Sequence, residues 1–275
     1  MTLKLMYITN QEEVAKIAEK SGVDWIFIDL EINGKDARQG HLDTVISRHS
    51  INDVGKIKKV LKKSKLLVRV NPIYDGSEDE INRVIQDGAD IVMLPFFKTK
   101  EEVETFVKFI DDRAEVCLLC ETAEAVENMD DILKVQGINY VHIGLNDLHL
   151  SYNKKFMFEL LVDGTVEALC NKFKAKEILY GFGGIAQLGQ GALPAENIIA
   201  EHFRLGSNMA ILSRSFCNTS KISGIDEITE IFKSGIRKIR EYEDTLSKEE
   251  QKFFDENQKT VHSKVNELVY SIVKE

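Results

Sequence analysis

The stretch EVCLLCETAEAVENMDDILKVQGINYVHIGLNDL, residues 115–148, decides the fold of this chain. Its apolar run Val116–Leu119 predicts a buried strand, the amphipathic pattern over Ala123–Val135 predicts a helix, and the apolar run Tyr140–Ile143 predicts a second buried strand. A helix between two buried strands is typical of a parallel crossover, because parallel strands cannot be joined by a tight turn. The stretch therefore predicts an α/β protein.

The same alternation of short apolar runs and longer amphipathic runs continues along most of the chain. We predict strands over Leu3–Ile8, Trp25–Leu30, Leu66–Asn71, Ile91–Pro95, Glu115–Glu121, Tyr140–Gly144, Ile178–Gly183 and Asn208–Leu212. Helical patterns lie between them over Gln11–Lys20, Asn52–Lys63, Glu78–Gln86, Lys100–Ile110, Ala123–Val135 and Met157–Lys174. Eight strands separated by helices favour a closed (β/α)₈ TIM barrel over an open sheet.

Two acidic residues follow neighbouring predicted strands. Glu121 ends the first strand of the quoted stretch, and Asp147 comes just after the second. The C-terminal ends of barrel strands meet at one face, so these carboxylates are expected side by side. A buried carboxylate is costly unless it is paired or binds a cation. The pair therefore predicts a site for Mg²⁺, Mn²⁺ or another hard divalent ion.

Three further charged residues lie at the same predicted face. Asp29 and Glu31 end the second strand, and Arg69 lies near the end of the third. A buried arginine needs an anionic partner, which is either one of these carboxylates or a substrate anion. We favour substrate contact for Arg69 and take Asp29 and Glu31 as further catalytic candidates. The predicted strands after the first contain no lysine, which argues against an aldolase that forms a Schiff base.

The polar segment after the second strand, residues 32–50, is a candidate lid or substrate-binding loop. His41 is the candidate base, with His49 as the second choice, because the pKa of histidine lies near neutrality. Arg38 is a candidate contact for a substrate anion. A surface or capping role is the alternative for both histidines.

Glycines cluster after the seventh strand, at Gly181-Phe182-Gly183-Gly184, and Ser213-Arg214-Ser215 follows the eighth. Loops at these places often bind phosphate in barrels of this type, but glycines also permit close packing. We favour packing here. We also interpret His142, within the sixth strand, as structural.

The pattern changes after Asp226. Glu227–Leu246 and Lys248–Lys274 predict two long charged helices, and the second carries an apolar stripe that includes Val261 and Val265. We therefore divide the chain into a catalytic barrel, residues 1–226, and a helical extension, residues 227–275. The extension packs either on its own barrel or on a neighbouring subunit, and a homo-oligomer is expected.

Composition limits the partners. The formal net charge of −9 argues against binding to nucleic acid or to an anionic membrane surface. The segment Met1–Asn10 lacks the features of a signal peptide. The Cys117-x-x-Cys120 pair lies within a strand pattern, so we interpret it as two buried thiols. A cytoplasmic protein with reduced cysteines is expected.

Several of these motifs together resemble the HpcH/HpaI aldolase and citrate lyase β superfamily. They are Trp25-x-x-x-Asp29-x-Glu31, Val68-Arg69-Val70-Asn71, Leu94-Pro95, Glu121-Thr122-Ala123-Glu124-Ala125-Val126 and Gly144-x-x-Asp147-Leu148. The resemblance covers the second to sixth strands well and the rest of the chain in outline. It implies a (β/α)₈ barrel that assembles as trimers or hexamers, often with exchange of a C-terminal helix.

The resemblance also implies roles for particular residues. Residues matching Glu121 and Asp147 hold Mg²⁺, Mn²⁺ or a similar ion, which pyruvate or another 2-oxo acid chelates through its keto and carboxylate oxygens. The residue matching Arg69 stabilises the enolate. Backbone N–H groups near Asn146 and Asp147 bind the substrate carboxylate.

One residue departs from the family pattern. The hydroxy-oxo-acid aldolases of this family have a histidine directly after the acid that matches Glu31, and this chain has Ile32. Either a loop residue such as His41 replaces that base, or the reaction differs. The leading expectation is a metal-dependent carbon–carbon lyase (class II aldolase type) acting on a 4-hydroxy-2-oxo acid through a pyruvate enolate. The alternatives are a CoA-thioester or phosphoenolpyruvate enzyme, or a non-catalytic binding protein that has lost the base.

Overall fold

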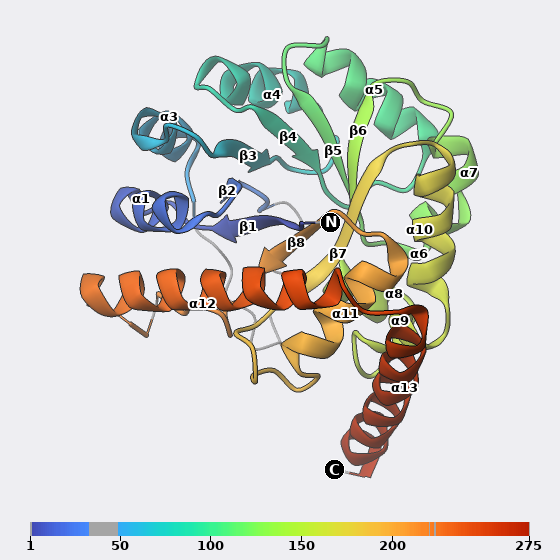
Figure 1. The fold of residues 1–275 in the computed structure, drawn as a ribbon. Coiled ribbons are helices and arrows are strands. Elements are labelled where there is room, and N and C mark those ends of the chain that lie inside the picture. Colours follow the sequence, from blue (N-terminus) through green and yellow to red (C-terminus); the bar gives the residue numbers. More distant parts are fainter. Residues whose placement is uncertain (1, 33–48, 220, 223, 275) are drawn as a thin grey trace.

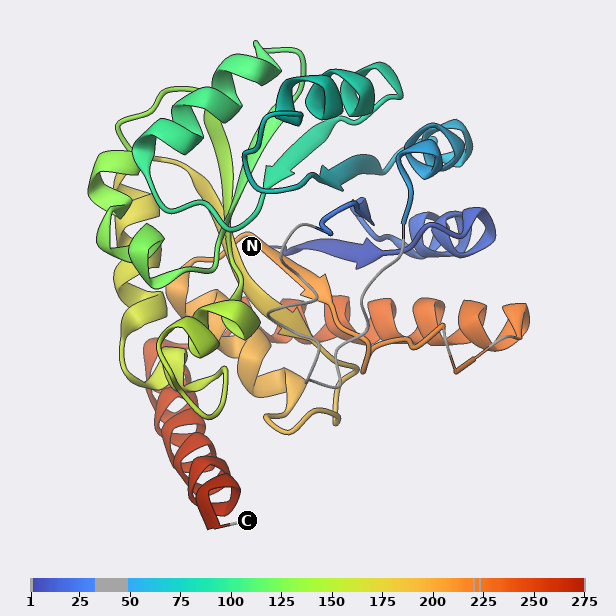
Figure 2. The ribbon, with the colours of Figure 1, turned by 180° about the vertical axis from the view of Figure 1, so that it is seen from behind.

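The computed structural model describes residues 2–32, 49–219, 221–222 and 224–274. Eight parallel strands form a closed barrel in sequence order, β1 to β8, and helices surround it (Figures 1 and 2). The predicted (β/α)₈ barrel is confirmed. The strands are β1 (Lys4–Ile8), β2 (Trp25–Asp29), β3 (Lys65–Arg69), β4 (Ile91–Leu94), β5 (Glu115–Cys120), β6 (Ile138–Ile143), β7 (Leu179–Ile185) and β8 (Met209–Leu212).

The helices follow the predicted alternation, with two differences. They are α1 (Glu12–Ser21), α3 (Ile51–Val60), α4 (Ser77–Gln86), α5 (Lys100–Ile110), α6 (Ala123–Glu127), α7 (Met129–Ile132), α8 (Leu145–Ser151), α9 (Glu159–Val162), α10 (Thr165–Ala175), α11 (Ala195–Leu205), α12 (Ile225–Leu246) and α13 (Gln251–Lys274). The single helix predicted over Ala123–Val135 is wrong, because it breaks at Asn128, whose side chain donates to the carbonyl of Lys98. The helix predicted over Met157–Lys174 breaks at Gly164, which has a left-handed φ of 86°.

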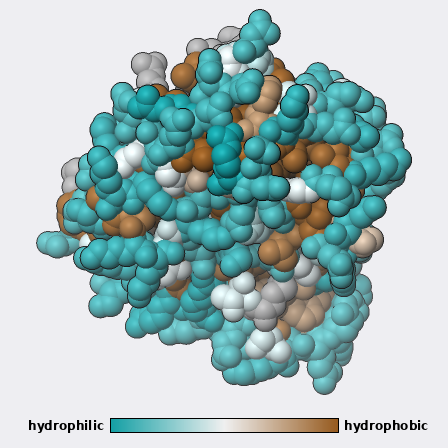
Figure 3. All heavy atoms as spheres, turned by 90° about the horizontal axis from the view of Figure 1, so that it is seen from above, coloured by the Kyte–Doolittle hydropathy of each residue, from teal (hydrophilic) through white to brown (hydrophobic). Residues whose placement is uncertain are grey.

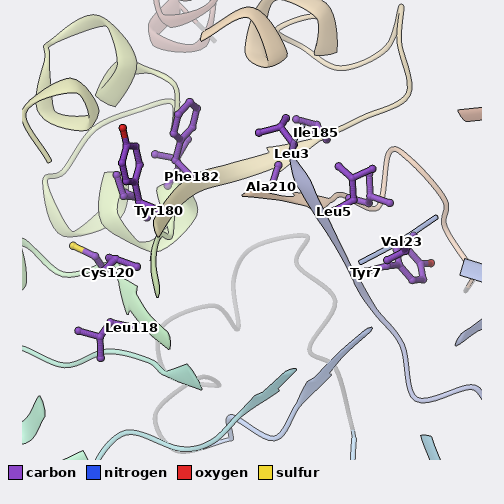
Figure 4. Packing of buried hydrophobic residues seen from close by; sticks show 14 of the residues in the cluster. Leu3, Leu5, Tyr7, Val23, Leu118, Cys120, Tyr180, Phe182, Ile185 and Ala210 are labelled. Carbon is purple, nitrogen blue, oxygen red and sulfur yellow. The ribbon is translucent and has the colours of Figure 1, made fainter. Parts of the chain in front are cut away.

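The barrel wall separates two apolar layers. Inside it lie Met6, Trp25, Phe27, Leu67, Ile91, Met93, Cys117, Leu119, Tyr140 and Met209. A larger cluster fills the space between the strands and the helices, and Figure 4 shows part of it on the outer side of the strands. This alternation follows from the period of two along a strand.

The same alternation explains the cysteine pair. Cys117 belongs to the inner layer and Cys120 to the outer one, so the two side chains point to opposite faces of β5. Both thiols are free and buried, and burial raises the pKa of each well above its usual value. The interpretation as buried thiols is confirmed.

The two C-terminal helices contact this chain's own barrel. Helix α12 packs against α1, and its Phe232 ring meets Tyr7 of β1 edge-on with 4.8 Å between ring centroids. Helix α13 packs against α11 and α9, where Asn257 bonds to Asn197 and Glu201. The far end of α13 projects away from the barrel (Figures 1 and 2).

Hydrophilic residues cover most of the face drawn in Figure 3. Among the described residues, no helix combines the length and the apolar character that a membrane span requires.

Candidate active site

A pocket of about 250 Å³ lies at the C-terminal ends of the barrel strands. It is lined by Ile8, Phe27, Asp29, Arg69, Leu119, Glu121, His142, Gly144, Leu145, Asn146, Asp147, Met157, Gly183, Gly184, Ile211 and Ser213. The C-terminal face is where barrels of this type carry their active sites. Its wall combines apolar side chains with a few converging charged groups, which is typical of a site for a small polar ligand.

Glu121 and Asp147 share this pocket, although they are separated by a whole helical connection in the sequence. Glu121 directly follows β5 and is 2% exposed, while Asp147 lies in the first turn of α8 and is 9% exposed. The N–H of Phe96 donates to Oε1 of Glu121 at 3.1 Å. Phe96 has a φ of 53°, an uncommon value for a bulky side chain, so local backbone strain accompanies this contact.

Gly144 lets the backbone after β6 lie directly against the Glu121 carboxylate. Cys120 of β5 pairs with Ile143 of β6, so the next residue of each strand, Glu121 and Gly144, are neighbours. A Cβ atom at position 144 would lie 2.9 Å from Oε2 of Glu121. Two buried carboxylates that line one pocket fit Mg²⁺ or Mn²⁺, which is commonly bound through one or two carboxylates with water and substrate as the other ligands. The described residues contain no group of three His, Cys, Asp or Glu side chains with metal-binding geometry.

Replacing Gly144 by alanine is expected to weaken divalent-metal binding about 10–100-fold, the range typical of changes next to metal ligands. The backbone at Gly144, with a φ of −81°, accepts alanine, so the effect would come from displacement of Glu121. Calorimetric titration with Mn²⁺ measures the affinity. Gly184→Ala is the control, because its added Cβ would meet no atom closer than 3.4 Å. Equal affinities in both variants would contradict the prediction.

Arg69 is paired with two carboxylates at the edge of the pocket. Asp29 and Arg69 are register partners on β2 and β3. The Nε and Nη2 atoms of Arg69 donate to the two oxygens of Asp29 at 2.9 and 2.8 Å, and Nη1 lies 3.4 Å from Oε2 of Glu31. Burial alone would lower the pKa of Arg69, but Asp29 and Glu31 outweigh it and hold that pKa above its usual value. The guanidinium is thus permanently charged and fixed in orientation.

The ion pair predicted as the alternative for Arg69 is therefore present, and Arg69 also lines the pocket. Substrate contact by Arg69 stays a prediction. Asp29 lines the same pocket, whereas Glu31 reaches it through Arg69.

His49, the second candidate base, contacts the end of β2. The Nδ1 atom of His49 accepts a hydrogen bond from the backbone N–H of Asp29 at 3.0 Å. Ile32 is 62% exposed, and its N–H donates to Asn71. Arg38 and His41 lie outside the described residues, so their roles stay predictions.

Strand β3 begins one residue earlier than predicted, at Lys65. This lysine lies at the N-terminal end of the strand, away from the pocket, and pairs with Glu115. The strand lysines of the described structure, Lys4 and Lys65, are therefore both at the end opposite the site. Neither lysine is therefore placed to form a Schiff base with a substrate in the pocket.

Several residues that line the pocket were not among the site residues predicted from the sequence. Gly181 has the packing role that we favoured, because a Cβ there would lie 2.1 Å from the carbonyl oxygen of Met209. Gly183, Gly184 and Ser213, however, line the pocket, and so does His142, which we had interpreted as structural. The period of two gave a usable signal for His142, because it places this side chain on the same inner face as Tyr140.

Comparison with known families gives one match. A family model described as HpcH/HpaI aldolase/citrate lyase matches residues 4–158, which is more than half of the chain. Among curated protein sequences, none matches the chain significantly.

Several solved structures share the fold at low sequence identity. An HpcH/HpaI aldolase from Desulfitobacterium hafniense DCB-2 is 15% identical with a TM-score of 0.61, covering 83% of this chain and 93% of its own. An HpcH/HpaI aldolase/citrate lyase family protein from Burkholderia cenocepacia J2315 is 14% identical with a TM-score of 0.62, covering 82% and 95%. The citrate synthase SbnG is 18% identical with a TM-score of 0.59, covering 78% and 87%.

Proposed function

Because the chain belongs to the HpcH/HpaI aldolase/citrate lyase family, whose members are lyase-type enzymes, we propose that it is a divalent-metal-dependent carbon–carbon lyase. Its proposed substrate is a 4-hydroxy-2-oxo acid, which is cleaved to an aldehyde and the enolate of pyruvate. The convergence of Glu121, Asp147 and Arg69 on one small pocket carries this proposal. Two carboxylates can hold the divalent ion that a 2-oxo acid chelates, and a fixed cation can stabilise the enolate that forms from it.

The metal site is proposed at Glu121 and Asp147, in keeping with a family that generally depends on a divalent ion. A divalent ion held there would act as a Lewis acid toward the keto and carboxylate oxygens of the substrate. Glu121 is positioned for this by the N–H of Phe96 and by the close approach that glycine permits at position 144. Asp147 lies in the first turn of α8, where the backbone N–H groups of Asn146 and Asp147 are proposed to bind the substrate carboxylate.

Arg69 is proposed to stabilise the negative charge that develops during cleavage. When the C3–C4 bond of the substrate breaks, its electron pair moves onto the C2 carbonyl and creates an enolate oxygen. The two oxygens of Asp29 accept hydrogen bonds from Nε and Nη2 of Arg69, which fixes the plane of the guanidinium before the substrate binds. A preorganised cation of this kind is a large source of rate enhancement.

The pocket size favours a small substrate. A volume of about 250 Å³ suits a short oxo acid and is small for most of a CoA thioester. SbnG is a citrate synthase, so formation of a carbon–carbon bond by the same enolate chemistry is included in the proposal.

We also propose that the protein is a homo-oligomer, because Tyr270, Ile272 and Val273 near the end of α13 are 42–65% exposed.

The proposal is tested by measuring pyruvate release from a panel of 4-hydroxy-2-oxo acids of increasing chain length. Release is expected with Mg²⁺ or Mn²⁺, and not after treatment with EDTA. Malyl-CoA and phosphoenolpyruvate are assayed separately as substrates of the alternative reactions, and for malyl-CoA the product measured is glyoxylate. Binding of Mn²⁺ and pyruvate without any turnover would instead support the non-catalytic alternative.

A further inference from the structure

His142 lies on the inner face of the barrel and lines the pocket. It is on β6, between its register partners Leu119 of β5 and Gly181 of β7, and it is 1% exposed. Its side chain shares the inner face of the barrel and lines the pocket together with Arg69 and Glu121. A buried imidazole in such a place needs a partner for each ring nitrogen, because an unpaired buried polar atom is costly.

One ring nitrogen of His142 has a partner that fixes the tautomer. Its Nε2 atom lies 3.1 Å from the carbonyl oxygen of Gly183. A carbonyl oxygen only accepts, so Nε2 carries the proton and Nδ1 keeps a lone pair. The strand pairing between β7 and β8 shifts between Gly181 and Gly184, and Gly183 within this irregularity has a φ of 54°. The Gly183 carbonyl therefore comes from a bulge-like segment that glycine permits.

The other ring nitrogen is unused. The Nδ1 atom of His142 is buried and has no hydrogen-bond partner among the described residues. Burial, together with a smaller effect of the positive charge of Arg69, lowers the pKa of His142 to about 4, so the ring is neutral near neutral pH. His142, which lines the pocket, thus carries a neutral nitrogen lone pair that accepts no hydrogen bond from the described residues.

We propose that Nδ1 of His142 accepts the proton of the C4 hydroxyl of the substrate and so acts as the base that is missing at position 32. This inference rests on the function proposed above. The O–H bond of the C4 hydroxyl breaks and its proton moves to Nδ1. The C4 oxygen forms the aldehyde carbonyl, the C3–C4 bond breaks, and its electron pair enters the enolate. The proton on Nδ1 is then available to C3 of the enolate, which yields pyruvate and restores the neutral ring.

Two substitutions distinguish the roles of the two ring nitrogens of His142. The side-chain amide of glutamine in His142→Gln can still donate to Gly183, but it leaves no acceptor at the Nδ1 position. The shorter amide in His142→Asn puts an acceptor near the Nδ1 position, loses the bond to Gly183, and cannot take up a proton. If His142 is purely structural, the glutamine variant should cleave the substrate as the wild type does. If His142 is the base, both variants should lose cleavage.

The test uses 4-hydroxy-2-oxopentanoate for cleavage and oxaloacetate as a second substrate. Oxaloacetate loses CO₂ to give the same enolate without removal of a hydroxyl proton, so it needs the metal and Arg69 but no base. His142→Gln is expected to lower kcat for cleavage about 10²–10⁴-fold, while decarboxylation falls less than about tenfold. Wild-type cleavage kinetics in His142→Gln would overturn the inference. A wild-type protein that performs neither reaction with Mg²⁺ would overturn the proposed function itself.

A second measurement does not depend on turnover or on the stability of a variant. The chain has six histidines, and nitrogen-15 spectra of labelled wild-type protein distinguish protonated from bare ring nitrogens. The probes are 2,4-dihydroxybutanoate, which has the C4 hydroxyl but no 2-oxo group, and 2-hydroxybutanoate, which lacks that hydroxyl. The signal of a bare Nδ1 is expected to shift with the first compound and not with the second. No shift with either compound at saturation would overturn the inference.

Discussion

Replacing Glu121 by glutamine is expected to abolish metal-dependent turnover. Glutamine keeps the size of the side chain but removes its negative charge, and a neutral amide is a poor ligand for a hard divalent ion. Loss of a ligand should cost more than the 10–100-fold typical of changes around a site. We therefore expect Mn²⁺ affinity to fall by more than about 100-fold in Glu121→Gln, and likewise in Asp147→Asn.

The barrel should remain folded in Glu121→Gln, because the Phe96 N–H can still donate to the amide oxygen at position 121. Glu124→Gln is the matched control, since Glu124 lies on α6 nearby but is half exposed and pairs with Lys98 instead. Calorimetric titration with Mn²⁺ and assays at saturating Mn²⁺ measure affinity and turnover. Unchanged Mn²⁺ affinity in both Glu121→Gln and Asp147→Asn would show that the metal does not bind to these two residues.

Replacing Arg69 by lysine is expected to reduce turnover about 10²–10³-fold, the usual effect of losing a donor to the transition state. Lysine keeps the positive charge, but its ammonium is a single point that cannot bind both oxygens of Asp29 and also face the pocket. The affinity for Mn²⁺ should change little. Steady-state kinetics on the panel substrate, together with metal titration, separate these effects.

Two controls distinguish the substrate role of Arg69 from its structural role. Asp29→Asn leaves a buried guanidinium without its main partner and should lower the free energy of unfolding by about 3–5 kcal/mol, as measured by urea denaturation. Arg204→Lys changes a buried arginine outside the pocket, where it pairs with Glu201 and Glu167, and should leave turnover unchanged. Arg69→Lys with full turnover and reduced stability would show that Arg69 is only structural.

Much of the architecture could be predicted from the sequence because local periodicity encodes it. The short apolar runs gave all eight strands to within a few residues, and their parallel order follows from the helices between them. The helix predicted over Ala123–Val135 was wrong because its break depends on the bond from Asn128 to Lys98, which is distant in sequence. Periodicity contains no information about such contacts.

The candidate site, like the fold, could be predicted from the sequence only in part. The placement of Glu121, Asp147, Asp29 and Arg69 at one face was predictable, because residues at the ends of parallel strands must meet there. The roles expected for the loop residues Arg38 and His41 stay predictions. For His142, the sequence gave the correct strand but did not show that the residue lines the pocket.

The sequence by itself thus determined the barrel and the face on which the acids gather, because both follow from the order and period of neighbouring residues. Only the tertiary structure decided which partner each group has. The register of β2 and β3 pairs Arg69 with Asp29, and the irregular end of β7 turns the Gly183 carbonyl toward His142. These pairings set charge orientation and tautomer, and they depend on distances of a few ångströms between residues that are 40 and 41 positions apart in the chain.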